Sequence, residues 1–205
     1  LLLKYKANID CIDQKNQTPL HIACHQRKLR MAKFLLKHKA NVLAKDDKNQ
    51  TPLHIACQNN DMDLIERLLK YKANIHDKNE NGFTPLHIAC ENRNLILATY
   101  LLKNKAKVDD FSLINQTPLH TACKKHHQVR MAKLLLSYKA NINQKDHNNQ
   151  SPLHIACHHN EIRMAKFLLK HKARVDVQDS LSRTPFFIAC KNKNEELAEL
   201  LLKYK

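Results

Sequence analysis

Thr84-Pro85-Leu86-His87-Ile88-Ala89-Cys90 is the stretch that decides the fold, because close copies of this heptapeptide recur along the whole chain. The other copies begin at Thr18, Thr51, Thr117, Ser151 and Thr184, so neighbouring starts lie 33 or 34 residues apart. A fixed period of this length is typical of one supersecondary unit stacked on copies of itself. The sequence therefore predicts one elongated array, although 205 residues would ordinarily suggest one or two globular domains.

Each copy of the heptapeptide begins with the signals of a helix start. The threonine or serine hydroxyl can cap the free amides of a first turn, and the proline that follows has its backbone angle preset for a helix. After each copy, apolar residues recur at a spacing of three to four, as in Leu29, Ala32, Leu35 and Leu36. This spacing predicts a second helix with one buried face. We expect two short helices in each unit, followed by a polar connector.

These residues resemble the ankyrin repeat, in which Thr-Pro-Leu-His opens a first helix and a stretch like residues 32–41 closes a second. The resemblance covers essentially the whole chain. It implies an all-α ankyrin-repeat solenoid of stacked helix-turn-helix units with projecting β-hairpin loops. We expect a single domain over residues 1–205. Its units are a partial repeat at 1–12, repeats at 13–45, 46–78, 79–111, 112–145 and 146–178, and an incomplete last repeat at 179–205.

A histidine recurs within five copies of the heptapeptide, and in the ankyrin family it is structural. The resemblance implies that its ring bonds the threonine hydroxyl and nearby backbone. A row of histidines could instead bind metal, but stacked repeats place them roughly 10 Å apart. That is too far for one ion with bonds of ~2 Å. We therefore expect neither a metal nor a cofactor at these residues, which are His21, His54, His87, His120 and His154.

The unit at 112–145 is irregular, because Cys123 and Met131 are one residue further apart than Cys24 and Met31. Insertions in repeats map to loops, so residues 124–128 are expected to bulge between the two helices. His126 and His127 in the bulge form a second group of histidines together with His158 and His159 of the next unit. Because no cysteine or carboxylate spacing supports a metal site there, solvent-exposed histidines are the favoured interpretation.

Six of the seven cysteines occupy one repeat position. Neighbouring copies should lie roughly 10 Å apart, beyond the ~4.4–6.8 Å between α carbons that a disulfide allows. We expect these cysteines to be small buried apolar residues in a reducing intracellular compartment. They are Cys24, Cys57, Cys90, Cys123, Cys157 and Cys190.

Glycine is nearly absent, although the family uses it at two left-handed backbone positions in each unit. Gly82 is the single glycine, and in the other hairpins its place is taken by Asn16, Asn49, Asn115, Asn149 and Ser182. Asparagine is the next best residue for this conformation. After the second helix a lysine stands where the family has glycine, which costs about 1 kcal/mol if the left-handed cap is kept. These residues are Lys39, Lys72, Lys105, Lys139 and Lys172.

The net charge is +16, and lysines cluster at the end of each second helix. There they complement the negative end of the helix dipole and favour solubility. Alternatively they form a basic ridge that meets an acidic protein, nucleic acid or anionic lipid. We expect nucleic acid to be the less favoured of these, because we expect no aromatic residues interleaved with the lysines as a base-stacking platform requires. No apolar run is long enough to cross a membrane.

The resemblance also implies a binding surface made of hairpin tips and the exposed side of the first helices. We expect it to use Phe83, Phe111, Leu113, Ile114, Gln116, Lys124, Lys125, His147, His158, His159, Leu181 and Arg183. Apolar side chains on projecting hairpins are suited to anchoring a partner. Alternatively, Phe111 and Ile114 fold back to fill gaps left by the missing glycines.

We therefore expect a non-catalytic, monomeric protein-protein interaction scaffold with a protein partner and no small-molecule substrate. No nucleophile motif, glycine-rich phosphate loop or tunable carboxylate pair supports catalysis. Two other functions stay open. One is a binder of an anionic partner through the lysine ridge. The other is a spacer or targeting arm of a larger protein.

Overall fold

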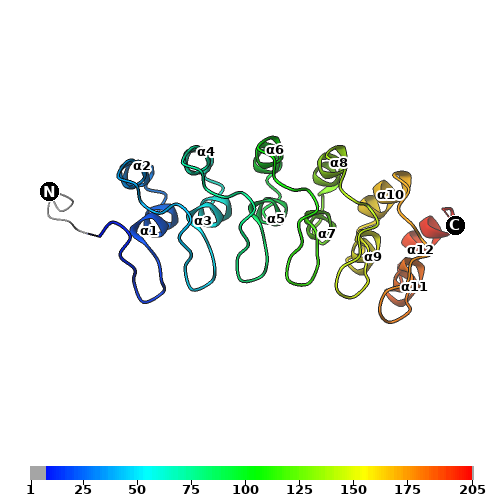
Figure 1. The fold of residues 1–205 in the computed structure, drawn as a ribbon. Helices are drawn as coiled ribbons and strands as arrows, with labels where there is room; N and C mark the ends of the chain where they lie inside the picture. The colour runs from blue at the N-terminus through cyan, green and yellow to red at the C-terminus, as the bar shows by residue number, and fades with distance from the viewer. Residues whose placement is uncertain (1–7, 205) are drawn as a thin grey trace.

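A computed structural model of the protein describes residues 8–204. In this range the chain forms six pairs of α-helices and no β-strand (Figure 1). The first helices of the pairs are α1 (Pro19–His25), α3 (Pro52–Gln58), α5 (Pro85–Glu91), α7 (Pro118–Cys123), α9 (Pro152–His158) and α11 (Pro185–Lys191). The second helices are α2 (Leu29–Lys37), α4 (Met62–Lys70), α6 (Leu95–Lys103), α8 (Val129–Ser137), α10 (Ile162–Lys170) and α12 (Glu195–Leu202).

The pairs stack side by side, so each first helix packs against its own second helix and against the next first helix. Figure 1 shows the first helices in a middle row, with the second helices on one side and the hairpin loops projecting on the other. The predicted all-α ankyrin-repeat solenoid is confirmed. The projecting loops are closed by hydrogen bonds of the turn type and do not contain strands.

The recurring histidine joins the start of its own first helix to the next unit. In the third unit the backbone amide of Thr84 donates to Nδ1 of His87 at 3.2 Å, and Oγ1 of Thr84 lies 2.9 Å from the same nitrogen. Because Nδ1 accepts, the ring proton lies on Nε2, which donates to the carbonyl of Gln116 in the next unit at 2.9 Å. The structural role expected for this histidine is confirmed, and the bond across the repeat interface adds to it.

Burial of one apolar face against the next unit holds the array together. Leu53, Ile55 and Leu64 have no exposed surface, and equivalent side chains recur in the other interior units. Removing such a side chain from water contributes roughly 1.5–3 kcal/mol. A single pair could not obtain this stabilisation alone, because part of its apolar surface is covered only by the neighbouring pairs.

Five of the six repeat cysteines are buried as predicted, but Cys190 is exposed. The prediction was wrong for Cys190 because no helix pair follows α11 and α12 in the described residues to cover it. For the same reason Phe186 and Phe187 are exposed. All seven cysteines are free. Burial raises the pKa of the Cys24 thiol to about 12, so this residue is a neutral apolar side chain at physiological pH.

Each hairpin is organised by the side chain of its first residue. In the second unit Oδ1 of Asp46 accepts from the amides of Lys48 and Gln50 at 2.9 and 2.8 Å. Asn49 adopts the left-handed conformation with φ 54°, as predicted. Each hairpin from the second to the sixth also donates one backbone hydrogen bond to the preceding hairpin, for example from the amide of Asp47 to the carbonyl of Lys15 at 3.1 Å. The hairpins therefore form a linked strip.

The lysines that replace glycine after the second helices are left-handed, with φ between 65° and 68°. The left-handed cap of the family is therefore kept without glycine. A further left-handed residue between the two helices of each unit was not predicted. The residues at this position are Arg27, Asn60, Arg93, His127, Asn160 and Lys193.

The partial repeat expected at residues 1–12 lies largely outside the described residues, which begin at Asn8. Within the described part, Oδ1 of Asp10 accepts from the amide of Asn41 in the first full unit at 2.9 Å. None of the helices at residues 8–204 has the length and hydropathy required to span a bilayer.

We predict that the free energy of unfolding falls as the pH drops below about 6.5. Burial lowers the pKa of all five recurring histidines, and that of His87 falls to about 4. The unfolded chain binds protons near pH 6.5 while the folded chain does not, so stability is lost between these two values. For His87 the loss is on the order of 3 kcal/mol at pH 4. Urea titrations at pH 7.5, 6 and 5 measure it, with exposed His147→Asn as the control that keeps the profile. An unfolding midpoint that is constant between pH 7.5 and 5 would contradict the prediction.

We also predict that Lys172→Gly raises the free energy of unfolding by up to about 1 kcal/mol, because it relieves the left-handed strain at φ 67°. The matched control is Lys166→Gly, an exposed position within α10. There glycine should cost about 1 kcal/mol. Chemical denaturation distinguishes the two, and equal destabilisation by both variants would show that the left-handed lysine carries no strain.

Candidate functional site

The hairpins and the exposed ends of the first helices form one continuous surface, which we call the hairpin surface. Two contacts join its parts. Nε2 of Gln58, at the end of α3, donates to Oε1 of Gln50 in the hairpin arm at 2.6 Å. In the fifth unit the side-chain nitrogen Nε2 of Gln150 donates to Nε2 of His158 at 2.9 Å. In these two units the end of the first helix thus contacts the arm of its own hairpin.

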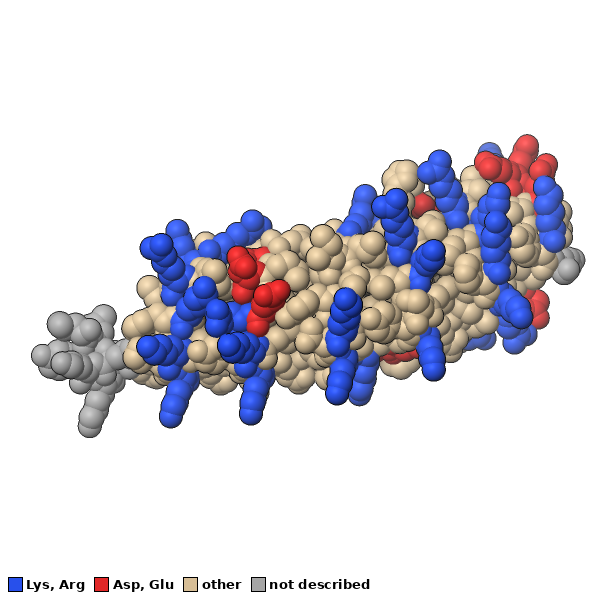
Figure 2. Space-filling view, turned by 90° about the horizontal axis from the view of Figure 1, so that it is seen from above, with Lys and Arg blue, Asp and Glu red and all other residues tan. Residues whose placement is uncertain are grey.

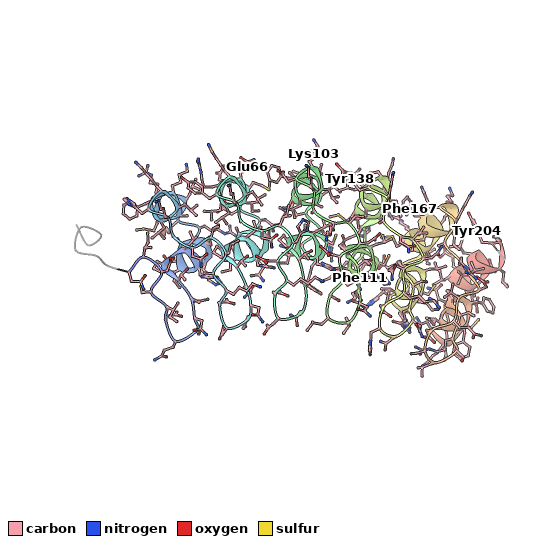
Figure 3. All side chains as sticks on the ribbon, in the orientation of Figure 1. Glu66, Lys103, Phe111, Tyr138, Phe167 and Tyr204 are labelled. Atoms are coloured by element: carbon pink, nitrogen blue, oxygen red, sulfur yellow. The ribbon has the colours of Figure 1, made fainter. Side chains whose placement is uncertain are left out.

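The fourth hairpin presents three apolar side chains on this surface. Phe111, Leu113 and Ile114 are 38%, 72% and 50% exposed. Figure 3 shows Phe111 on the hairpin side of the array, with Lys103 and Tyr138 on the opposite side. The alternative expectation was that Phe111 and Ile114 fold back to fill a gap. Ile114 keeps half of its surface exposed, whereas Phe111 keeps the smallest share of the three.

The backbone of the fourth hairpin is held on both sides. The amide of Leu113 donates to the carbonyl of Asn81 in the third hairpin at 3.0 Å. The carbonyl of Ile114 accepts from the amide of His147 in the fifth hairpin at 2.9 Å. Nζ of Lys78 donates to the carbonyl of Phe111 at 2.6 Å. The apolar side chains therefore project from a backbone that is already ordered.

The other apolar candidates differ in accessibility. Leu181 is 67% exposed on the sixth hairpin. Phe83 is only partly exposed, because its ring stacks on His87 with centroids 5.2 Å apart and planes inclined by 14°. One face of the Phe83 ring is thus covered by a residue of its own unit.

Gln116 was expected on the binding surface, and that prediction was wrong. Its side chain is 5% exposed, and Nε2 donates to Oδ2 of Asp146 in the next hairpin at 3.1 Å. The physical reason is that this hairpin starts with Ser112, whose short hydroxyl accepts from the Gln116 amide at 3.1 Å. Asp146 opens the next hairpin, and the longer glutamine side chain turns inward to bond to it.

The polar candidates gather on the ends of α7, α9 and α11. Burial lowers the pKa of Lys124, and burial together with nearby positive charge lowers the pKa values of His158 and His159. Arg183 is different, because Nε and one terminal nitrogen donate to Oδ2 of Asp179 at 2.9 and 2.7 Å. Burial raises the pKa of Asp179, but the hydrogen bonds outweigh burial and lower this pKa to about 2.

The remaining candidates are exposed or partly exposed. His147 is exposed at the tip of the fifth hairpin, and Lys125 is partly exposed after α7. The structure therefore groups Lys124, Lys125, His158, His159 and Arg183 near one another, and places the apolar residues on the hairpin tips.

The predicted bulge is present between Cys123 and Val129, where α7 ends and α8 begins. It brings Nδ1 of His126 into contact with the carboxylate of Glu161, which is otherwise buried before α10. Among residues 8–204 no three histidine, cysteine or acidic side chains are grouped so as to hold a metal ion.

The second helices carry the lysines of the expected ridge on the face opposite the hairpins. Figure 2, which looks onto this face, shows basic side chains along the whole array and acidic ones in a few places. Helices α2, α6, α8 and α10 contain no acidic residue. The described ridge lysines are all exposed, namely Lys37, Lys39, Lys70, Lys72, Lys103, Lys105, Lys139, Lys170, Lys172 and Lys203.

The ridge also contains aromatic residues that the sequence reasoning overlooked. His38, Tyr71 and His171 each stand between two lysines, and Tyr138 precedes Lys139. All four side chains are exposed. The expectation that no aromatic residues interleave with the lysines was wrong, and the Lys-Tyr-Lys and Lys-His-Lys triplets were the signal that could have shown it.

The comparisons with known proteins agree with this architecture. A sequence model of the family described as "Ankyrin repeats (3 copies)" matches residues 1–79, 53–146 and 130–205, which together span the chain. A search of curated proteins gave no match. A solved structure that matches is the crystal structure of the ankyrin repeat domain of Bcl-3, described as a unique member of the IkappaB protein family.

The match to the Bcl-3 domain covers 98% of this chain and 89% of that chain, with a TM-score of 0.86 and 23% sequence identity. At that identity the likeness shows the fold alone. The family match, which spans the chain, and the six stacked helix pairs lead to one conclusion. This chain belongs to the ankyrin repeat family.

Proposed function

We propose that this protein is a non-catalytic scaffold that binds a partner protein on its hairpin surface, with Leu113 and Ile114 as anchors. Ankyrin repeats are generally protein-protein interaction modules, so the family supports the class of function. The observation that carries the site is the exposure of Leu113 on a tip whose backbone is bonded to both neighbouring hairpins. Large apolar side chains at such positions are typical of binding hot spots.

The ordered backbone matters for affinity. Binding usually costs free energy for ordering loops and side chains, and a preorganised surface avoids part of this cost. Hydrogen bonds to Asn81 and His147 hold the fourth hairpin before any partner arrives. A partner that covers Leu113 and Ile114 would therefore gain burial without ordering the loop.

The thiol chemistry supports a role without catalysis. A nucleophilic cysteine needs a lowered pKa and access to solvent. Burial instead raises the pKa of Cys24 and Cys157 to about 12. Seven unpaired thiols also favour a reducing, intracellular location, and we propose that the protein works there as a monomer.

The second candidate function is binding of an anionic partner through the lysine ridge on the second helices. The acid-free helices α2, α6, α8 and α10 favour it, and so do the tyrosines and histidines interleaved with the lysines. A spacer or targeting arm would use neither surface.

We predict that a photo-crosslinking amino acid at position 113 captures a partner protein, whereas the same amino acid at position 96 does not. Leu113 and Ile96 are 72% and 73% exposed and lie on opposite sides of the array. With the captured protein purified, Leu113→Ser should weaken binding about tenfold, as expected for losing an anchor worth roughly 1.4 kcal/mol. Ile96→Ser should have no effect. Equal losses with both variants would count against the hairpin surface.

For the second candidate, we predict that the charge reversal of two exposed ridge lysines, Lys103→Glu with Lys170→Glu, weakens binding of an oligonucleotide of about 20 single-stranded thymidines. The affinity of the unmodified protein should fall linearly on a logarithmic salt scale, because phosphate contacts release counterions. Fluorescence anisotropy measures both effects. Binding that neither salt nor the reversal changes would exclude the ridge as the site.

A further inference from the structure

The hairpin surface is chemically uneven, and its last three units differ from its first three. On units four to six, basic and histidine side chains at the ends of α7, α9 and α11 adjoin one another, and we call this group the basic strip. The strip consists of Lys124, Lys125, His158, His159, Arg183 and Lys191. The charge of Lys124 acts on His159, and those of Arg183 and Lys191 act on His158, so the strip is continuous across three units.

The carboxylates that face the strip are largely occupied by other partners. Oδ1 of Asp146 accepts from the amides of Asn148 and Gln150, both at 2.9 Å. Its Oδ2 accepts from Gln116 at 3.1 Å.

Two other carboxylates near the strip are also engaged. Asp179 is held by Arg183, and Glu161 contacts His126. Glu91, exposed at the end of α5, is the carboxylate that acts on Lys124 from the neighbouring unit. None of the ion pairs within residues 8–204 involves Lys124, Lys125 or Lys191, so these three lysines are available to the carboxylates of a partner.

Apolar side chains stand on the hairpins of the first and last units that contribute to the strip. Leu113 and Ile114 project from the fourth hairpin, and Leu181 projects from the sixth, two units away. At about 10 Å per unit the two hairpins are roughly 20 Å apart. An extended peptide covers that distance in about six residue steps of ~3.3 Å.

We infer that units four to six hold an extended acidic segment of the partner, with one apolar side chain against Leu113 and Ile114 and another against Leu181. This inference rests on the proposed function and names the chemistry of the partner. Carboxylates of the segment face the basic strip, and its two apolar residues lie about six positions apart. The combination provides charge complementarity and two anchors at once.

The histidines of the strip make this binding depend on pH. In the free protein their pKa values lie below the usual value, because burial and positive neighbours disfavour a further positive charge. Carboxylates of a bound segment favour the protonated rings, so binding takes up protons. Affinity should therefore rise as the pH falls from 7.5 to 5.5.

The test uses a synthetic peptide, Leu-Glu-Asp-Glu-Asp-Glu-Leu, and the amide peptide Leu-Gln-Asn-Gln-Asn-Gln-Leu, both with blocked ends. Isothermal titration calorimetry with the full chain should show at least tenfold tighter binding of the acidic peptide. Lys124→Glu with Lys125→Glu should remove that preference. The matched control reverses two ridge lysines on the opposite face, Lys103→Glu with Lys170→Glu, and should keep the preference. Circular dichroism checks the fold of each variant.

The pH dependence is measured for the unmodified protein and for the double variant His158→Gln, His159→Gln. Affinity for the acidic peptide should rise between pH 7.5 and 5.5 in the unmodified protein and stay constant in the variant. Equal affinity for both peptides, or no binding of either, would overturn the inference. If the control variant, and not Lys124→Glu with Lys125→Glu, lost the preference for the acidic peptide, the acidic ligand would be assigned to the lysine ridge. Crosslinking from position 113 to a partner without an acidic segment would leave the proposed scaffold in place and refute the acidic chemistry.

Discussion

Contact between consecutive units is the constraint on which the whole structure depends. A pair of short helices has an apolar face that only the next pair can cover. At each of the first five interfaces a buried histidine adds a directional bond to this contact. Its Nδ1 accepts from the amide of the cap residue, and its Nε2 donates to a carbonyl one unit further on, as His87 does to Gln116. The same ring thus sets the start of a helix and the position of the neighbouring hairpin.

This arrangement separates stability from recognition. Apolar residues, histidines and cysteines at the interfaces hold the stack, while hairpin tips and helix ends are free to vary. Two exposed surfaces result. The hairpin surface combines apolar tips with a basic strip in its last three units, and the second-helix face carries lysines with interleaved tyrosine and histidine. In a scaffold of this kind, function depends on side chains that do not take part in packing between the units.

The scarcity of glycine shows that residues other than glycine can adopt the left-handed conformations of the family. Left-handed conformations occur in each unit at asparagine, serine, lysine or arginine. The hairpins tolerate this because the side chain of the first residue and the bond to the preceding hairpin determine the turn. In the one hairpin with glycine, a Cβ atom at Gly82 would come within 2.4 Å of the Leu113 nitrogen. The third and fourth hairpins therefore approach more closely than a side chain at this position would allow.

Periodicity and the local signals of the heptapeptide determined the helical repeat, the helix starts and the bulge after Cys123, because each depends on residues close together in the sequence. The resemblance to the family implied the structural histidines and the left-handed hairpin residues. Tertiary contacts decided what local patterns could not. Gln116 turns inward to Asp146, Cys190 is uncovered, and Glu161 contacts His126. Each of these outcomes depends on which residue of a neighbouring unit, or none, lies against the side chain. A repeat pattern sets the positions that meet, but the particular side chains that meet there decide exposure and charge.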